Sequence, residues 1–105
     1  MNLNQLKVFY VAAKSGSFSA AAEALFITQP AVTKQIQQLQ TTYGVKFFNR
    51  FGKKMVLTDA GKVLYDIADK IFQFESQAEE KIRGGGGATL MNLKRKGKEI
   101  KAFLF

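Results

Sequence analysis

Residues 17–58 read SFSAAAEALFITQPAVTKQIQQLQTTYGVKFFNRFGKKMVLT, and this stretch decides the fold. Ser17 and Thr28 are favoured N-cap residues, and each directly precedes a run with helical character. We therefore expect one short helix over residues 18–25 and a longer one over residues 29–42. Only a tight turn separates them, so this part of the chain is predicted to be two helices joined by a turn.

The second of these helices is predicted to have two different faces. At about 100° per residue, Val32, Ile36, Leu39 and Tyr43 cluster on one side, which predicts a buried apolar face. The opposite side carries small polar, amide and basic side chains. Gly44 follows directly and predicts a left-handed cap that ends the helix.

The flanking sequence completes the predicted fold. An amphipathic helix over residues 3–14 precedes the stretch, and two short strands, residues 46–49 and 54–57, form a hairpin within it. Thr58 then caps a long helix that we expect to reach about Arg83. The predicted fold class is mainly α: a winged helix-turn-helix of three helices and a two-stranded β wing, followed by a long linker or dimerisation helix.

The composition favours an anionic partner. Sixteen Lys and Arg against eight Asp and Glu give a net charge of +8 and a pI near 9.9. Residues 24–58 contain no Asp or Glu, although five basic residues lie there. A helix with small polar residues at its tip, followed by a cationic hairpin, fits the grooves of duplex DNA. We therefore expect double-stranded DNA to be the partner.

The sequence also excludes several classes of site. The chain contains no Cys and no His, which excludes disulfides, thiolate nucleophiles, imidazole bases and most zinc sites. With no catalytic constellation and no cofactor loop, we expect no enzyme, no metal and no cofactor. No apolar run approaches a membrane span and residues 1–4 do not begin a signal peptide, so we expect a cytoplasmic protein with no membrane partner.

Each predicted DNA contact follows from side-chain chemistry. The amide of Gln29 can pair with adenine, Pro30 can pack on a thymine methyl, and Thr33 can reach a base or a phosphate. The other candidates suit phosphates, and the hairpin cations suit the flanking backbone or the minor groove. The candidate DNA-binding residues are Thr28, Gln29, Pro30, Thr33, Lys34, Gln37, Arg50, Lys53 and Lys54.

The long helix carries an apolar stripe that is longer than the small core beneath it can cover. Such surplus apolar surface usually pairs with another helix, so we expect a homodimer through this helix. The candidate interface residues are Leu64, Ile67, Ile71, Phe74 and Ala78.

At these positions the chain closely resembles the LysR-type transcriptional regulators of bacteria. The resemblance covers about residues 2–83 and is most specific at the start of the second predicted helix of the stretch, QPAV at residues 29–32. It is carried by Leu3, Gln5, Leu6, Phe9, Gly16, Ser17, Phe18, Ala21, Ala22, Leu25, Gln29, Pro30, Ala31, Val32, Gln35, Ile36, Leu39, Gly44, Phe48, Arg50, Leu57, Thr58, Ala60 and Gly61.

The resemblance implies a DNA-binding domain over residues 1–58 and a linker helix over residues 59–83 that pairs antiparallel with its twin. Residues 84–105, which resemble nothing in the family, are predicted to be a Gly-rich hinge, with four consecutive glycines at residues 84–87, followed by a basic and apolar tail. It implies that Gln29, Pro30, Thr33 and Lys34 read the major groove while the wing lies along the minor groove. Lys53 stands where an arginine is common, and Gln40 replaces a frequent glutamate. The family continues with an effector-binding domain, which we do not find, so we expect no small-molecule effector for this chain.

Each of these features also has a simpler interpretation. The glutamine-rich helix face can be a solvated surface, Lys53 and Lys54 can protect a sheet edge, and the apolar stripe can be core beneath a missing neighbour. One alternative function is an interaction module that heterodimerises with full-length relatives through the linker helix. Another is membrane attachment through the basic and apolar tail, residues 88–105.

Overall fold

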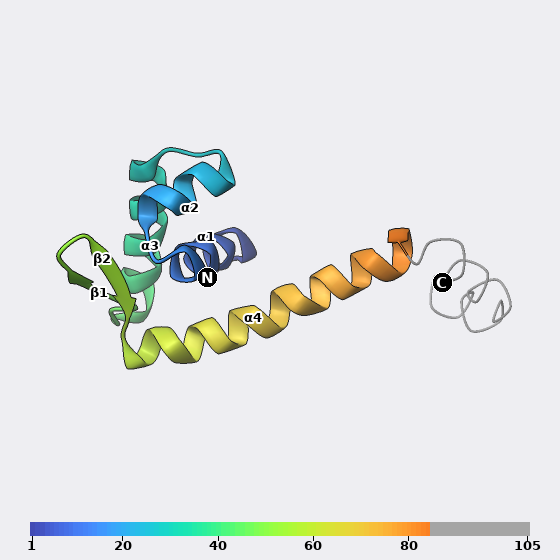
Figure 1. Ribbon diagram of the computed structural model, residues 1–105. Helices are drawn as coiled ribbons and strands as arrows, with labels where there is room; N and C mark the ends of the chain where they lie inside the picture. Colours follow the sequence, from blue (N-terminus) through green and yellow to red (C-terminus); the bar gives the residue numbers. More distant parts are fainter. Residues whose placement is uncertain (85–105) are drawn as a thin grey trace, which may run out of the picture. The chain divides into compact units, whose positions relative to one another are not determined.

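The computed structural model describes residues 1–84 of the chain (Figure 1). It shows the predicted mainly α winged helix-turn-helix followed by a long helix, which confirms the predicted fold class. The chain divides into two compact units after Lys70, and α4 begins in the first unit and ends in the second. Residues 85–105, which make up nearly all of the predicted hinge and tail, lie outside the described residues. The elements are α1 (Leu3–Ser15), α2 (Phe18–Leu25), α3 (Gln29–Tyr43), β1 (Phe48–Phe51), β2 (Lys54–Leu57), α4 (Asp59–Glu79) and a π-helical segment (Glu80–Gly84).

Side-chain caps fix where the first three helices begin. The Ser17 hydroxyl accepts a hydrogen bond from the Ala20 amide at 3.2 Å, and the Thr28 hydroxyl accepts one from the Ala31 amide at 3.2 Å. All three predicted N-caps are confirmed, since the Thr58 hydroxyl likewise accepts a hydrogen bond from the Gly61 amide at 3.0 Å. Asn2, which the sequence analysis did not single out, caps α1 in the same way. Because each cap satisfies an amide that the helix leaves unpaired, these positions specify the helix starts locally.

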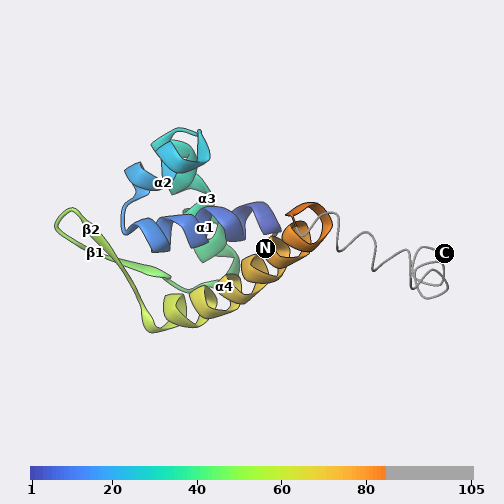
Figure 2. The same cartoon turned by 45° about the vertical axis from the view of Figure 1, so that its right-hand side comes forward.

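The core of the first unit lies where α1, α2 and α3 pack together beside the base of the wing (Figure 2). Phe9, Val32 and Leu39 are the largest fully buried side chains. The Phe9 ring contacts the rings of Phe47 and Phe48, at centroid distances of 5.6 and 5.4 Å. These aromatic contacts, one edge-on and one tilted, tie the wing to the helical core.

The hairpin is antiparallel as predicted, but its first strand is shifted. We predicted residues 46–49, whereas β1 is Phe48–Phe51 and pairs with β2 in the register Phe48↔Leu57 to Phe51↔Lys54. The turn is therefore shorter, and Gly52 occupies its first position with a φ of +61°. Phe47 lies opposite Thr58 in the same register and its carbonyl accepts the Thr58 amide, but the pair lacks its second ladder bond because the Phe47 N–H donates to the Gln40 side chain.

Two helix ends also differ from the prediction. Tyr43, expected on the buried face of α3, is 48% exposed because it is the last residue of the helix and lies beyond the layer that Leu39 forms.

The fourth helix was expected to stay α-helical to about Arg83, but the α-helix ends at Glu79. The following π-helical turn ends at Gly84, the first of four glycines, where helix propensity is lowest.

The turn between α2 and α3 holds Phe26 in the left-handed region, at a φ of 57°. The Ile27 amide donates to the Ala22 carbonyl at 3.1 Å, which closes the helix end. The Phe26 side chain is 95% exposed, so it gains no packing in return for this backbone cost.

We expect Phe26→Gly to raise the free energy of unfolding by about 1 kcal/mol. Relief of the left-handed penalty, about 1–2 kcal/mol, outweighs the extra chain entropy of glycine, about 0.5–1 kcal/mol. The melting temperature should rise by about 4–8 °C. Gly44→Ala is the matched control: Gly44 has a φ of 61° and open space around it, so that change should lower the melting temperature. A lower melting temperature for Phe26→Gly would contradict the strain argument.

Candidate nucleic-acid interface

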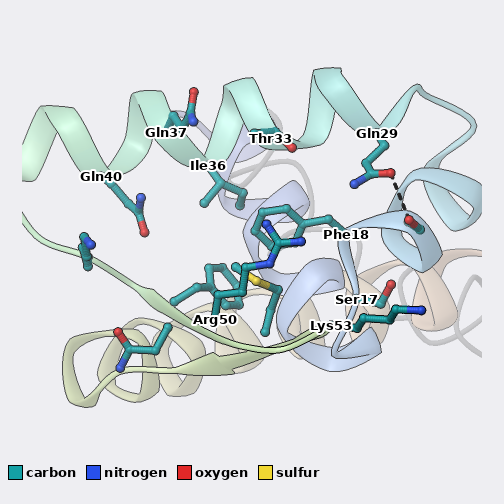
Figure 3. Close-up of a pocket in the computed structure, with 14 residues that line it drawn as sticks. Ser17, Phe18, Gln29, Thr33, Ile36, Gln37, Gln40, Arg50 and Lys53 are labelled. Atoms are coloured by element: carbon teal, nitrogen blue, oxygen red, sulfur yellow. Dashed lines mark hydrogen bonds between the residues drawn. The ribbon is translucent and has the colours of Figure 1, made fainter.

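An open groove of about 630 Å³ lies between α3 and the wing, and the start of α2 closes one end of it (Figure 3). One wall is α3 and the other is the hairpin, so the groove combines amide and hydroxyl side chains with cations. Its lining residues are Ser17, Phe18, Ser19, Gln29, Thr33, Ile36, Gln37, Gln40, Lys46, Phe48, Asn49, Arg50, Lys53 and Met55.

Three of the predicted DNA-binding residues share the α3 wall. Gln29, Thr33 and Gln37 follow one another at intervals of four residues, so each lies about one turn along from the last. Figure 3 shows them in a row along the helix. Gln29 and Gln37 are exposed and Thr33 is half-buried, so the polar groups of this row remain accessible at the surface of α3.

Two predicted cations stand on the facing wall. Arg50 and Lys53 both line the groove, and the Arg50 Nε donates to the Gly52 carbonyl at 3.2 Å. That bond uses one of the five guanidinium donors, so the others remain for a ligand. Lys46 adds a third cation, and none of the residues lining the groove is acidic. The groove is therefore electropositive and suited to an anionic ligand.

The remaining predicted contacts lie outside this groove. Lys34 lines a separate shallow hollow of about 510 Å³ on the outer side of α3, together with Gln37. Thr28 and Pro30 are exposed at the start of α3, and Lys54 is exposed on β2. The structure thus brings Gln29, Thr33, Gln37, Arg50 and Lys53 together and leaves the other four on neighbouring surfaces.

The sequence analysis missed several polar groups of the groove. Ser17 and Ser19 contribute from the start of α2, and Lys46 and Asn49 contribute from the hairpin. The Ser19 hydroxyl donates to the Gln29 Oε1 at 3.0 Å and so orients the amide of a predicted base-reading residue. The short polar side chains around the N-cap of α2 were the available signal, since a helix N-terminus can bind phosphate.

A brace of three hydrogen bonds sets the wing against α3. The Gln40 Oε1 accepts from the Phe47 amide at 2.9 Å, the Thr58 amide donates to the Phe47 carbonyl at 3.0 Å, and the Thr58 hydroxyl donates to the Lys46 carbonyl at 2.6 Å. The segment that enters β1 is therefore fixed from both sides. Gln40, which replaces a glutamate that is frequent in the family, therefore has a structural role: its side-chain oxygen accepts the hydrogen bond that holds Phe47 against α3.

The apolar stripe of α4 divides between two faces. Ala68 is fully buried, whereas Val63 is 62% exposed, Ile67 is 49% exposed and Phe74 is 71% exposed. Ile67 and Phe74 are two of the five predicted interface residues. Of the other three, Leu64 is half-buried, and Ile71 and Ala78 are exposed. The residues predicted to form a seam are thus largely accessible.

Neither a membrane span nor a metal cluster is found in the part of the chain that the structure describes. Within residues 1–84, no helix is long and apolar enough to cross a membrane. The same residues contain no group of three or more acidic, Cys or His side chains that could hold a metal ion.

Comparison with known proteins agrees with this architecture. Residues 3–62 match the family model of bacterial regulatory helix-turn-helix proteins of the lysR family. The chain is 39% identical over 92 residues to the HTH-type transcriptional activator CmpR of Synechocystis, and 36% identical over 94 residues to the RuBisCO operon transcriptional regulator of Allochromatium vinosum. These matches cover 88% and 90% of the chain, which spans 30% and 31% of the relatives' own lengths.

A solved structure shows the same fold. The chain in the crystal structure of the CbnR_DBD-DNA complex is 32% identical, with a TM-score of 0.68 over 81% of this chain and 98% of that one. The chain therefore shares its fold with a relative that was solved in complex with DNA. With the family model covering more than half of its length, the chain belongs to the LysR family of helix-turn-helix regulators.

Proposed function

We propose that this chain binds double-stranded DNA sequence-specifically as a homodimer and so regulates transcription. The observation that carries the proposal is the electropositive groove between α3 and the wing, with amide and hydroxyl groups along one wall and cations on the other. The DNA complex of a relative with the same fold supports it.

In the proposed complex, the N-terminal half of α3 enters the major groove. Gln29 and Thr33 meet the base edges there, and Pro30, exposed beside them, packs on a thymine methyl. The wing cations Arg50 and Lys53 lie along the adjacent minor groove or its phosphates. Phosphate contacts supply most of the affinity, and the few base contacts supply the specificity.

The exposed stripe of α4 supports the proposed dimer. In this arrangement the helices of two copies pair through Leu64, Ile67, Ile71, Phe74 and Ala78, and two recognition helices are presented together. Two-fold symmetry then requires an operator with two inverted half-sites, which places the recognition helices in successive major grooves.

The first experiment is selection from a random duplex library by the full chain, repeated at two salt concentrations. We expect an enriched interrupted palindrome. We also expect affinity to fall with salt: five cations per copy lie between residues 34 and 54, and if all five contact phosphates the slope of log affinity against log salt is about −4 to −5 per half-site. Weak binding that is indifferent to sequence would contradict the proposal.

The same exposed stripe favours one second candidate. A chain that pairs α4 with a full-length relative would act as an interaction module, and its own DNA affinity would be dispensable. Selection without any enriched sequence, together with formation of mixed dimers with such a relative, would favour this module over the operator-binding dimer.

A further inference from the structure

Tyr10 of α1 makes a two-point contact with α4 inside the first unit. Its hydroxyl donates to a carboxylate oxygen of Asp69 at 2.7 Å, and its ring stacks on the ring of Tyr65 with centroids 5.3 Å apart and planes 21° apart. The Tyr10 side chain is buried, and the Lys14 Nζ lies 5.7 Å from its ring centroid. No predicted DNA contact and no predicted dimer contact uses this cluster.

The contact is directional. A hydrogen bond to an ionised carboxylate is short and depends strongly on angle, and aromatic pairs prefer particular ring geometries. The Asp69 hydrogen bond, followed by burial, raises the pKa of Tyr10 to about 12, so its hydroxyl keeps the proton that it donates at any physiological pH. Together the two contacts oppose rotation of α4 about its own axis.

The contact and the proposed seam lie on different faces of the same turns of α4. At about 100° per residue, Tyr65 and Asp69 each lie about 160° around the helix from Ile67, and about 100° and 140° from Leu64. Ile67 is accordingly exposed, while Leu64 and Asp69 are half-buried. Whatever fixes Tyr65 and Asp69 against α1 therefore also fixes the direction in which Leu64 and Ile67, the seam residues of these turns, face.

We propose that Tyr10 and Asp69 are positioning residues that set the half-site spacing which the dimer accepts. The inference rests on the proposed function. The packing of α1 on α3 in the three-helix core means that holding the first turns of α4 against α1 fixes Leu64 and Ile67, where the seam begins, relative to the recognition helix. Each added base pair turns one half-site by about 34° relative to the other, so a rigid connection must discriminate between spacings that differ by one base pair.

The test compares the full wild-type chain with Tyr10→Phe, which keeps the ring and removes the donor. Each protein is titrated with a duplex that carries one selected half-site and with palindromes whose spacing changes by single base pairs. We expect wild type to lose about tenfold in affinity, equivalent to about 1.4 kcal/mol, one base pair away from the best spacing. Tyr10→Phe should bind the single half-site with the affinity of wild type. Its affinity for the palindrome should fall by less than about threefold when the spacing changes by one base pair.

Two further variants sharpen the comparison. Asp69→Ala removes the acceptor of the same hydrogen bond and should broaden the spacing preference in the same way. Tyr43→Phe removes a hydroxyl from an exposed tyrosine at the end of α3, so its spacing profile should match that of wild type. Equal affinity for the single half-site shows that the DNA-binding domain of each variant is folded.

The possible failures are distinguishable. If Tyr10→Phe and Asp69→Ala keep the narrow spacing preference of wild type, the positioning role is wrong. If wild type binds the half-site specifically but accepts all spacings equally, the positioning role is also wrong while the DNA-binding function stands. If wild type selects no half-site at all, it is the proposed function that fails.

Discussion

Replacing Gln29 and Thr33 together by alanine should lower the affinity for the selected operator by about 30- to 25,000-fold. Each specific base contact contributes about 1–3 kcal/mol of discrimination, so the loss of two removes about 2–6 kcal/mol. Both side chains line the groove, and Gln29 is exposed at the start of α3. Affinity for unrelated duplex should change little, because the cations that contact phosphate remain. Fluorescence anisotropy with operator and unrelated duplexes at one salt concentration measures both quantities.

A matched double variant controls for the loss of a glutamine and a threonine from the same helix. Gln38→Ala with Thr42→Ala changes two exposed residues of α3 that do not line the groove between the helix and the wing. This variant should keep its operator affinity to within about threefold. Both double variants should melt near the wild-type temperature, since the caps at Ser17 and Thr28 are untouched. Unchanged operator affinity in Gln29→Ala with Thr33→Ala would show that α3 does not read the bases.

Gly61→Ala should destabilise the first unit by about 3 kcal/mol, the upper end for overpacking. A Cβ at Gly61 would overlap the carbonyl oxygen of Phe47 and lie 2.9 Å from the Leu57 Cδ2. The Phe47 carbonyl accepts the Thr58 amide at 3.0 Å, so it cannot move away without breaking the brace that holds the wing. Thermal unfolding followed by circular dichroism should show a melting temperature lower by about 12–24 °C.

The same substitution at Gly84 provides the control. A Cβ there would meet only the Glu80 Cγ at 3.7 Å, an ordinary van der Waals distance. Gly84→Ala should therefore leave the melting temperature unchanged or raise it slightly, as expected for alanine in place of glycine within a helical turn. A Gly61→Ala protein as stable as wild type would mean that the start of α4 can move away from the Phe47 carbonyl at little cost.

Local signals in the sequence were sufficient for the helices. α2 has the predicted bounds and α3 differs by one residue at its end, because N-cap side chains and a terminal glycine act on backbone groups only a few residues away. The first strand was misplaced for the opposite reason. Whether Phe47 forms a full ladder pair depends on Gln40, seven residues away, whose side chain accepts the Phe47 N–H, and no strand propensity contains that information.

The candidate site was likewise only partly predictable from the sequence. The residue types that suit DNA were apparent, but which of them lie together was not. One groove is lined by the predicted residues Gln29, Thr33, Gln37, Arg50 and Lys53 together with Ser19 and Lys46, whereas Lys34 lines another hollow. The roles of the nine candidate DNA-binding residues and the five candidate interface residues remain predictions. Their accessibility is what the structure adds.

The sequence by itself determined the order of the helices, the positions of their caps, the cationic hairpin and the family to which the chain belongs. Those features depend on residue type and on interactions over a few positions. Only the tertiary structure decided which side chains line the groove and which face of α4 stays exposed. These depend on contacts between distant residues, such as Tyr10 with Asp69, 59 positions apart, whose geometry exists only after α1 and α4 have packed.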